Sequence, residues 1–156
     1  MAIQPGQKAP DFTLYDTDKK PVTLAEQRGK NVLLLFFPLA FTGTCTKELC
    51  SVRDNIGQYN NTDAQVFGIS VDAPPTLGKF KLEQGLNFPL LSDFNKEASA
   101  AYGCLYDVFN GWMKGVSKRS AFVIDKDGIV QYAEVLAKAG DLPNFEGINS
   151  TLSSLP

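Results

Sequence analysis

Histidine is absent from all 156 residues of the chain. This absence excludes Ser-His-Asp and Cys-His catalysis, zinc sites with histidine ligands and a pH switch based on imidazole. Any catalysis must therefore use thiols, carboxylates, lysines or arginines. The chain also lacks a glycine-rich phosphate loop, and the turn Asp125-Lys126-Asp127-Gly128 lacks the ligand spacing of a calcium loop. We expect neither a metal nor a bound cofactor.

The sequence has no excess of charge and no long hydrophobic run. Lys and Arg total 15 and Asp and Glu total 17, so the formal net charge of −2 provides no basic field for nucleic acid or membranes. The longest apolar run, residues 32–41, is interrupted by Pro38 and is shorter than the roughly 20 residues of a membrane helix. The N-terminus shows no secretory signal pattern. We therefore expect no nucleic-acid partner and no membrane.

Cysteine is scarce, and its count of three is odd. An odd count in a chain that is large enough to build its own core does not indicate a disulfide scaffold. This favours a reducing, cytoplasmic compartment in which at least one thiol is kept for its reactivity. With 44% hydrophobic and 21% charged residues, the composition predicts a single globular domain over residues 1–156.

Hydrophobic patterning in the first half predicts strands and a helix in α/β order. Residues 11–14 and 21–24 alternate weakly around a polar turn, which predicts an N-terminal β-hairpin. Residues 32–37 are continuously apolar and predict a central strand that is covered on both faces, and residues 66–71 predict a second one. Apolar positions spaced by three and four predict a helix over residues 44–58.

The second half adds shorter elements. We expect a helix over residues 75–84, a strand over 88–91 and a helix over 96–102. Residues 121–124 and 129–135 flank an Asp-Gly turn and predict an antiparallel hairpin. A last helix is expected to be capped by Asp141, with Pro143 in its first turn. This order predicts a thioredoxin-like α/β fold, in which helices flank a mixed central sheet with an N-terminal β-hairpin extension.

Cys45 shows the clearest sign of chemistry. It follows the central strand and lies in the first turn of the predicted helix, at the sheet edge where ligands usually bind. Unpaired N–H groups and the positive end of the helix dipole favour a thiolate there. A thiol whose pKa falls from about 8.5 to about 6 is roughly nine-tenths ionised at neutral pH without a general base. The alternative is a small apolar residue that completes a buried helix stripe.

Pro38, Thr42 and Cys45 form the signature Pro-x-x-x-Thr-x-x-Cys, by which the chain resembles a peroxiredoxin of the AhpC/TSA superfamily. The resemblance covers nearly the whole chain. Residues 32–43 resemble the one-cysteine alkyl hydroperoxide reductase E type, whereas residues 45–50 resemble peroxiredoxin Q, also called bacterioferritin comigratory protein. The first type implies a homodimer and the second a monomer.

The resemblance implies a thiol-dependent peroxidase that reduces hydrogen peroxide and organic hydroperoxides. Cys45 would attack the terminal peroxide oxygen and become a sulfenic acid. Thr42 would place its hydroxyl on the thiolate and the peroxide, and Pro38 would shield the thiolate from bulk water. Arg119 would lie beside Cys45 and stabilise the developing charge, and Glu48 would orient Arg119. Electrons would come from a thioredoxin-like or glutaredoxin-like protein or a low-molecular-weight thiol.

Cys50 lies five residues after Cys45. On an α-helix this spacing separates the two Cα atoms by roughly 8 to 9 Å, beyond the ~7 Å limit for a disulfide, so the pair can close only if the first helical turns unwind. The resemblance to peroxiredoxin Q makes Cys50 a candidate resolving cysteine, and the one-cysteine type argues against it. Cys104 is interpreted as a small buried hydrophobe rather than a second resolving thiol.

Other interpretations remain at this stage. Without the resemblance, Arg119 would be a surface charge at a strand start, and Thr42 and Glu48 ordinary helix-entry residues. Trp112 and Met113, in a loop over residues 110–118, could line a substrate or partner surface or serve as a partly buried anchor. A disulfide oxidoreductase of the thioredoxin type is disfavoured, because that chemistry uses two cysteines separated by two residues, whereas four residues separate Cys45 and Cys50. A non-enzymatic thiol switch or holdase is the further alternative.

Overall fold

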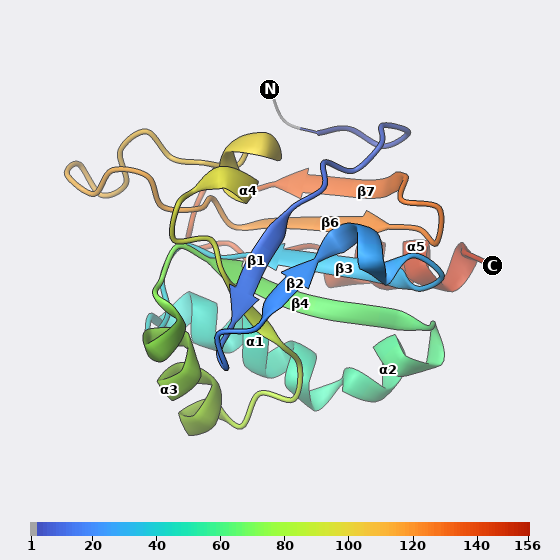
Figure 1. Cartoon of the computed structure of the whole chain (residues 1–156), viewed down its shortest axis with the longest axis horizontal. Coiled ribbons are helices and arrows are strands. Elements are labelled where there is room, and N and C mark those ends of the chain that lie inside the picture. The colour runs from blue at the N-terminus through green and yellow to red at the C-terminus, as the bar shows by residue number, and fades with distance from the viewer. Residues whose placement is uncertain (1–2) are drawn as a thin grey trace.

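The computed structural model describes residues 3–156 and is built on one mixed sheet of seven strands in the order β2-β1-β5-β4-β3-β6-β7 (Figure 1). At its centre β3 (Asn31–Phe36) pairs in parallel with β4 (Ala64–Ser70) and antiparallel with β6 (Ser120–Ile124). The last strand, β7 (Val130–Val135), pairs antiparallel with β6. The predicted mixed α/β sheet is confirmed.

The N-terminal hairpin forms the other edge of the sheet. β1 (Thr13–Asp16) pairs antiparallel with β2 (Pro21–Thr23) and, on its other side, with β5 (Leu90–Ser92). A short 3-10 helix, η1 (Leu24–Gln27), follows β2. The predicted hairpin is therefore present, but its first strand begins at Thr13 rather than at residue 11.

Helices cover both faces of this sheet (Figure 1). One face carries α1 (Gly43–Asp54), α2 (Ile56–Asn61), α3 (Pro74–Gln84) and α5 (Phe145–Ser154). The other face carries α4 (Glu97–Ala101). Among residues 3–156, no helix has the length and apolar character that crossing a bilayer requires.

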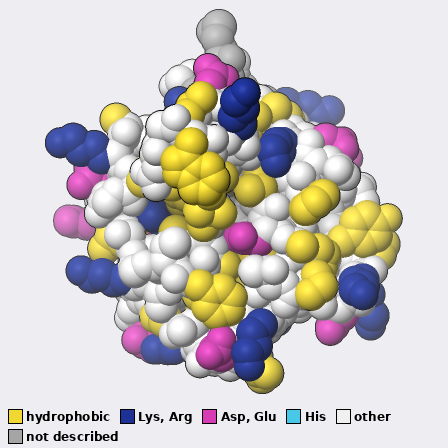
Figure 2. All heavy atoms as spheres, turned by 90° about the vertical axis from the view of Figure 1, so that its left-hand side faces the viewer, with side chains coloured by type: hydrophobic (Ala, Val, Ile, Leu, Met, Phe, Trp, Pro, Cys, Tyr) yellow, Lys and Arg dark blue, Asp and Glu magenta, His cyan; other side chains and the backbone are white. Residues whose placement is uncertain are grey.

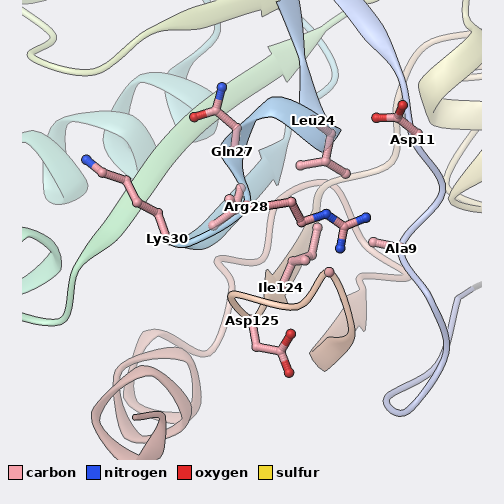
Figure 3. A pocket seen from close by; sticks show the side chains of 10 residues that line it. Ala9, Asp11, Leu24, Gln27, Arg28, Lys30, Ile124 and Asp125 are labelled. Atoms are coloured by element: carbon pink, nitrogen blue, oxygen red, sulfur yellow. The ribbon is translucent and has the colours of Figure 1, made fainter.

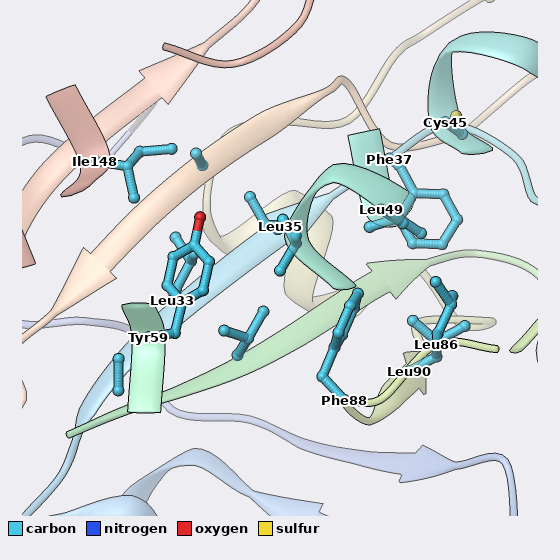
Figure 4. Packing of buried hydrophobic residues seen from close by; sticks show 14 of the residues in the cluster. Leu33, Leu35, Phe37, Cys45, Leu49, Tyr59, Leu86, Phe88, Leu90 and Ile148 are labelled. Carbon is cyan, nitrogen blue, oxygen red and sulfur yellow. The ribbon is translucent and has the colours of Figure 1, made fainter. Parts of the chain in front are cut away.

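Strand β3 divides its side chains between two buried clusters, because successive residues of a strand point to opposite faces. Its odd-numbered apolar residues pack with Cys45 and Leu49 of α1 (Figure 4). Its even-numbered residues pack with Tyr102 and Cys104 on the other face. All six residues of β3 are buried, as the continuous apolar run predicts.

Two predictions of helix boundaries are wrong. The helix expected over residues 44–58 is two helices, because Asn55 ends α1. The Asn55 side chain donates to the Ser51 carbonyl and its backbone N–H to the Val52 carbonyl, and asparagine competes with helix propagation in this way. The last helix is capped by Asn144, which accepts the Gly147 N–H, and not by Asp141.

The β6–β7 turn lies at the end of β6 that faces away from the start of α1. Gly128 in this turn has φ +84°, which favours glycine. Figure 3 shows Arg28, from the segment after η1, beside this turn, and its guanidinium donates to the Asp127 carbonyl. A Cβ at Gly128 would collide with the Arg28 guanidinium. The predicted Asp-Gly hairpin is confirmed, and Arg28 packs over it.

Candidate active site

The loop after β3 places Cys45 at the start of α1. Thr42 is the N-cap residue with extended backbone, and Cys45 is the third residue of the helix. The Cys45 side chain is only 1% exposed, yet it lines an open pocket of about 240 Å³ together with Pro38, Thr42 and Arg119. A small molecule in this pocket can therefore come close to a sulfur atom that bulk water barely reaches.

Arg119 reaches this pocket because of strand register. It directly precedes β6, whose first residue, Ser120, pairs with Phe36 at the last position of β3. Its Nη2 atom donates to Cys45 Sγ at 3.2 Å, across 74 positions of sequence. The Nε and Nη2 atoms also donate to the Ala139 carbonyl at 3.1 and 2.9 Å. The guanidinium is therefore held in one orientation beside the sulfur.

Glu48 completes a buried charge cluster one helical turn after Cys45. Its Oε1 accepts a hydrogen bond from Arg119 Nη1 at 2.6 Å, and its side chain is fully buried. Its Oε2 has no hydrogen-bond partner in the described part of the chain. Burial raises the pKa of Glu48 to about 7, although Arg119 opposes the rise; Glu134 adds to it. A carboxylate without solvent or a second donor is costly to ionise.

The Arg119 guanidinium donates hydrogen bonds to two ionisable groups, Glu48 and Cys45. Burial alone would lower its pKa, but Glu48 and Cys45 together outweigh burial and raise it. Arg119 therefore stays a cation although it is buried, and charge-assisted hydrogen bonds of such a group are strong. This arrangement favours negative charge on the Cys45 sulfur without any imidazole.

Thr42 differs from the expected geometry. Its hydroxyl donates to the Leu39 carbonyl at 2.7 Å, within its own loop, and therefore does not donate to the Cys45 sulfur. The Thr42 carbonyl accepts from the Thr46 hydroxyl at 2.8 Å, which ties the loop to the first turn of α1. Thr42 still lines the pocket. The Thr42 hydroxyl donates within the local turn because the Leu39 carbonyl has no helical hydrogen-bond partner there.

Cys50 and Cys104 lie outside the pocket, and all three cysteines are free thiols. Cys50 is partly buried, and its Sγ lies 3.6 Å from Gln84 Oε1 at the end of α3. Cys104 is fully buried on the opposite face of the sheet, as expected for a small hydrophobe. Burial raises the pKa of the Cys104 thiol to about 12, against a smaller lowering by a Ser120 hydrogen bond.

Sequence reasoning missed a hairpin that forms one wall of the pocket. Bridges join Leu105 to Ser117 and Phe109 to Met113, and Phe109 and Asn110 line the pocket. Asn110 and Gly111 both have positive φ, at 55° and 81°. Two such residues in sequence are typical of a tight hairpin turn, so the dipeptide Asn-Gly was the signal that could have found it.

Trp112 lies next to the tip of this hairpin and is 75% exposed, so the interpretation as a partly buried anchor does not hold for this residue. Met113 is partly buried. Figure 2 shows this side of the molecule, where hydrophobic groups are separated by polar and charged ones. In the part of the chain that the structure describes, no group of three or more Cys, Asp or Glu side chains could hold a metal ion.

Comparisons with known proteins show the family of this chain. The model of the AhpC/TSA family matches residues 5–133. Alkyl hydroperoxide reductase E of Mycobacterium tuberculosis is 47% identical over 133 residues, which cover 83% of this chain and 84% of that protein. The chloroplastic peroxiredoxin Q of Oryza sativa subsp. japonica is 37% identical over 130 residues, covering 83% of this chain and 58% of that protein.

Among solved structures, the crystal structure of peroxidoxin BcpB from Mycobacterium tuberculosis superposes with a TM-score of 0.87 at 30% identity and covers 99% of both chains. The family model spans most of the chain, and the alkyl hydroperoxide reductase E of Mycobacterium tuberculosis matches over more than two thirds of both proteins. The family uses peroxides as substrates and thiols as reductants. This chain, with its thioredoxin-like fold, therefore belongs to the AhpC/TSA family and is a thiol-dependent peroxidase of the peroxiredoxin type.

Proposed function

We propose that Cys45 is the nucleophile of peroxide reduction. The observation that carries the proposal is the 3.2 Å contact between Arg119 Nη2 and Cys45 Sγ, at a helix N-terminus that opens into a pocket. The thiolate attacks the terminal peroxide oxygen, a sulfur–oxygen bond forms and the oxygen–oxygen bond breaks. The leaving alkoxide or hydroxide takes up a proton to become an alcohol or water. Cys45 is thereby oxidised to a sulfenic acid.

The residues around Cys45 support this step in different ways. Arg119 stabilises the thiolate and the charge that develops on the peroxide oxygens, which is the role of preorganised donors in a water-poor site. Glu48 orients Arg119 through the 2.6 Å ion pair. Pro38 is buried beside the sulfur and limits its hydration, and Thr42, at the N-cap position of α1, lines the pocket.

Stopped-flow oxidation of the reduced protein tests this proposal. We expect a second-order rate constant for hydrogen peroxide far above that of free cysteine, and its loss in Cys45→Ser. Cys104→Ser serves as the matched control, because it removes a thiol that is equally buried but outside the pocket. A wild-type rate constant close to that of free cysteine would reject the peroxidatic role and would favour a thiol switch or holdase.

For regeneration, we propose that Cys50 resolves the Cys45 sulfenic acid as an intramolecular disulfide with loss of water. Cys50 lies on the same helix and is partly buried, so only α1 must change. The first turns of α1 have to unwind, and the contact of Cys50 with Gln84 has to break. Peptide mapping after one equivalent of peroxide tests this: a linked Cys45–Cys50 peptide supports it, and sulfenic or sulfinic Cys45 alone contradicts it.

We propose that residues 1–156 act as one domain in the cytoplasm. We also propose that a thioredoxin-like or glutaredoxin-like protein or a low-molecular-weight thiol supplies the two electrons that regenerate Cys45. The similarity to the alkyl hydroperoxide reductase E type leads us to propose a homodimer. Light scattering should give twice the 17.0 kDa of one chain. Turnover assays with each reductant class, one at a time, identify the electron donor.

A further inference from the structure

The loop between β3 and α1 carries Pro38 and Thr42 to the Cys45 pocket, and one residue in it is conformationally unfavourable. Phe41 has φ +65°, a region that side chains other than glycine rarely adopt. Its ring packs on Phe80 of α3, with ring centroids 5.2 Å apart. Such a backbone persists only when surrounding contacts hold it, so other contacts must fix this loop.

Asp72 supplies a contact from outside the loop. Its Oδ2 accepts the Ala40 N–H at 2.8 Å, across 32 positions of sequence. Asp72 follows β4 and stands just before α3, where an aspartate would ordinarily cap the helix. The N-cap of α3 is Ala73, however, without a side-chain cap. The Asp72 carboxylate is therefore used on the active-site loop and not on its own helix.

Two serines hold Asp72 itself in place. The Ser70 hydroxyl donates to Asp72 Oδ2 at 2.7 Å, and the Ser92 hydroxyl donates to the Asp72 carbonyl at 2.7 Å. Ser70 and Ser92 are register partners at the last positions of β4 and β5. Both are buried. Asp72 is thus fixed to the ends of β4 and β5 through both its carboxylate and its backbone carbonyl.

We propose that Asp72 is a positioning residue for peroxide reduction. It fixes Ala40 and, through it, the loop that sets Pro38 and Thr42 around the Cys45 sulfur. It is not a catalytic residue, since it does not line the pocket. The inference rests on the proposed role of Cys45. A misplacement of about 1 Å in a reacting site can reduce a rate by roughly 10²-fold, so a released loop has a measurable effect.

Three variants separate geometry from charge. Asp72→Ala removes the acceptor of the Ala40 N–H, and we expect the rate constant of Cys45 oxidation to fall by roughly 10-fold or more. Asp72→Asn keeps one oxygen that can accept from both the Ala40 N–H and the Ser70 hydroxyl, so its rate constant should stay close to that of the wild type. Asp18→Ala removes an exposed carboxylate in the β1–β2 turn as the matched control and should change nothing.

Two further measurements identify the cause of any loss. Alkylation of Cys45 by iodoacetamide needs the thiolate but not the peroxide geometry, so Asp72→Ala should alkylate at nearly the wild-type rate. Hydrogen exchange at the Ala40 amide should accelerate in Asp72→Ala and stay slow in Asp72→Asn. Both assays are made below the unfolding transition, as checked by circular dichroism.

Several outcomes would overturn the inference. Asp72→Ala that oxidises as fast as the wild type would show that the loop needs no anchor, while the fast wild-type reaction would leave the role of Cys45 intact. A parallel fall in alkylation would move the effect from the peroxide geometry to the thiolate. If Asp72→Ala does not fold, Ser70→Ala takes its place: it removes one support of the carboxylate, and an unchanged oxidation rate contradicts the proposal.

Discussion

Cys45 and Cys104 are buried to nearly the same extent, with exposed fractions of 1% and 0%, but their surroundings differ. Cys45 begins a helix, lines a pocket and accepts a hydrogen bond from Arg119. Cys104 lies in the apolar cluster of the other sheet face, and burial raises its pKa to about 12. Burial therefore does not decide the reactivity of a thiol by itself. A buried cation and a helix N-terminus favour the thiolate.

The difference follows from strand alternation. Ala121 and Val123 of β6 belong to the cluster that contains Cys45, and Phe122 and Ile124 belong to the cluster that contains Cys104. Arg119 lies two residues before Ala121, on the same side of the strand, and its guanidinium donates to Cys45. The next residue, Ser120, faces the other way and is a hydrogen-bond partner of Cys104. A shift of one residue would exchange the two environments.

The largest effect that this comparison predicts comes from replacing each of the two cysteines by serine. Cys45→Ser should lose fast peroxide reduction completely, and Cys104→Ser should keep it. Fast oxidation in Cys45→Ser would mean that Cys50 or Cys104 is the nucleophile and would break the comparison. Stopped-flow fluorescence of Trp112, the single tryptophan, together with direct peroxide consumption measures both.

Arg119 should have the next largest effect. Arg119→Ala removes the donor to the Cys45 sulfur, so the oxidation rate constant should fall by roughly 10²- to 10³-fold, the range for losing one preorganised donor. Arg119→Lys retains the charge but not the fork of donors and should recover only part of the rate. An unchanged rate in Arg119→Ala would show that the helix N-terminus suffices.

Glu48 should make stability depend on pH. Its pKa is about 7 in the folded protein against 4.5 for a free side chain, so the folded state binds this proton more tightly than the unfolded chain. Stability should therefore fall as pH rises from about 4.5 to about 7, by an amount on the order of 3 kcal/mol.

Glu48→Gln tests this, because it cannot ionise and should lose that part of the pH dependence. Urea unfolding at several pH values measures it. Equal slopes in the two proteins would mean that Arg119 keeps Glu48 ionised throughout this range, despite the missing partner of its Oε2.

The smallest effect should be that of Cys104→Ala. It removes one sulfur atom from a packed core and should lower the free energy of unfolding by about 1 kcal/mol. The rate constant of peroxide reduction should not change. Differential alkylation sharpens the same comparison: Cys45 should react in the native protein and Cys104 only after unfolding.

Much of the fold could be predicted from the sequence because its signals are local. The continuous apolar run of β3, the alternation of the hairpins and the helix stripe that contains Cys45 are each set by neighbouring residues. The errors were also local: Asn55 interrupts a stripe that continues in α2, and Asn144 caps α5 in place of Asp141. Periodicity describes which face is buried, but side-chain hydrogen bonds decide where a helix starts and stops.

By itself, the sequence predicted a reactive cysteine at the start of a helix and determined that no imidazole of this chain can assist it. The contact of Arg119 with Cys45 was implied by the family resemblance, but no local pattern predicted it. Only the tertiary structure showed that a Glu48 oxygen has no partner among the described residues and that Asp72 accepts the Ala40 N–H in the loop of Thr42. The physical reason is strand register. Pairing between β3 and β6, and between β4 and β5, brings together side chains that no local pattern connects.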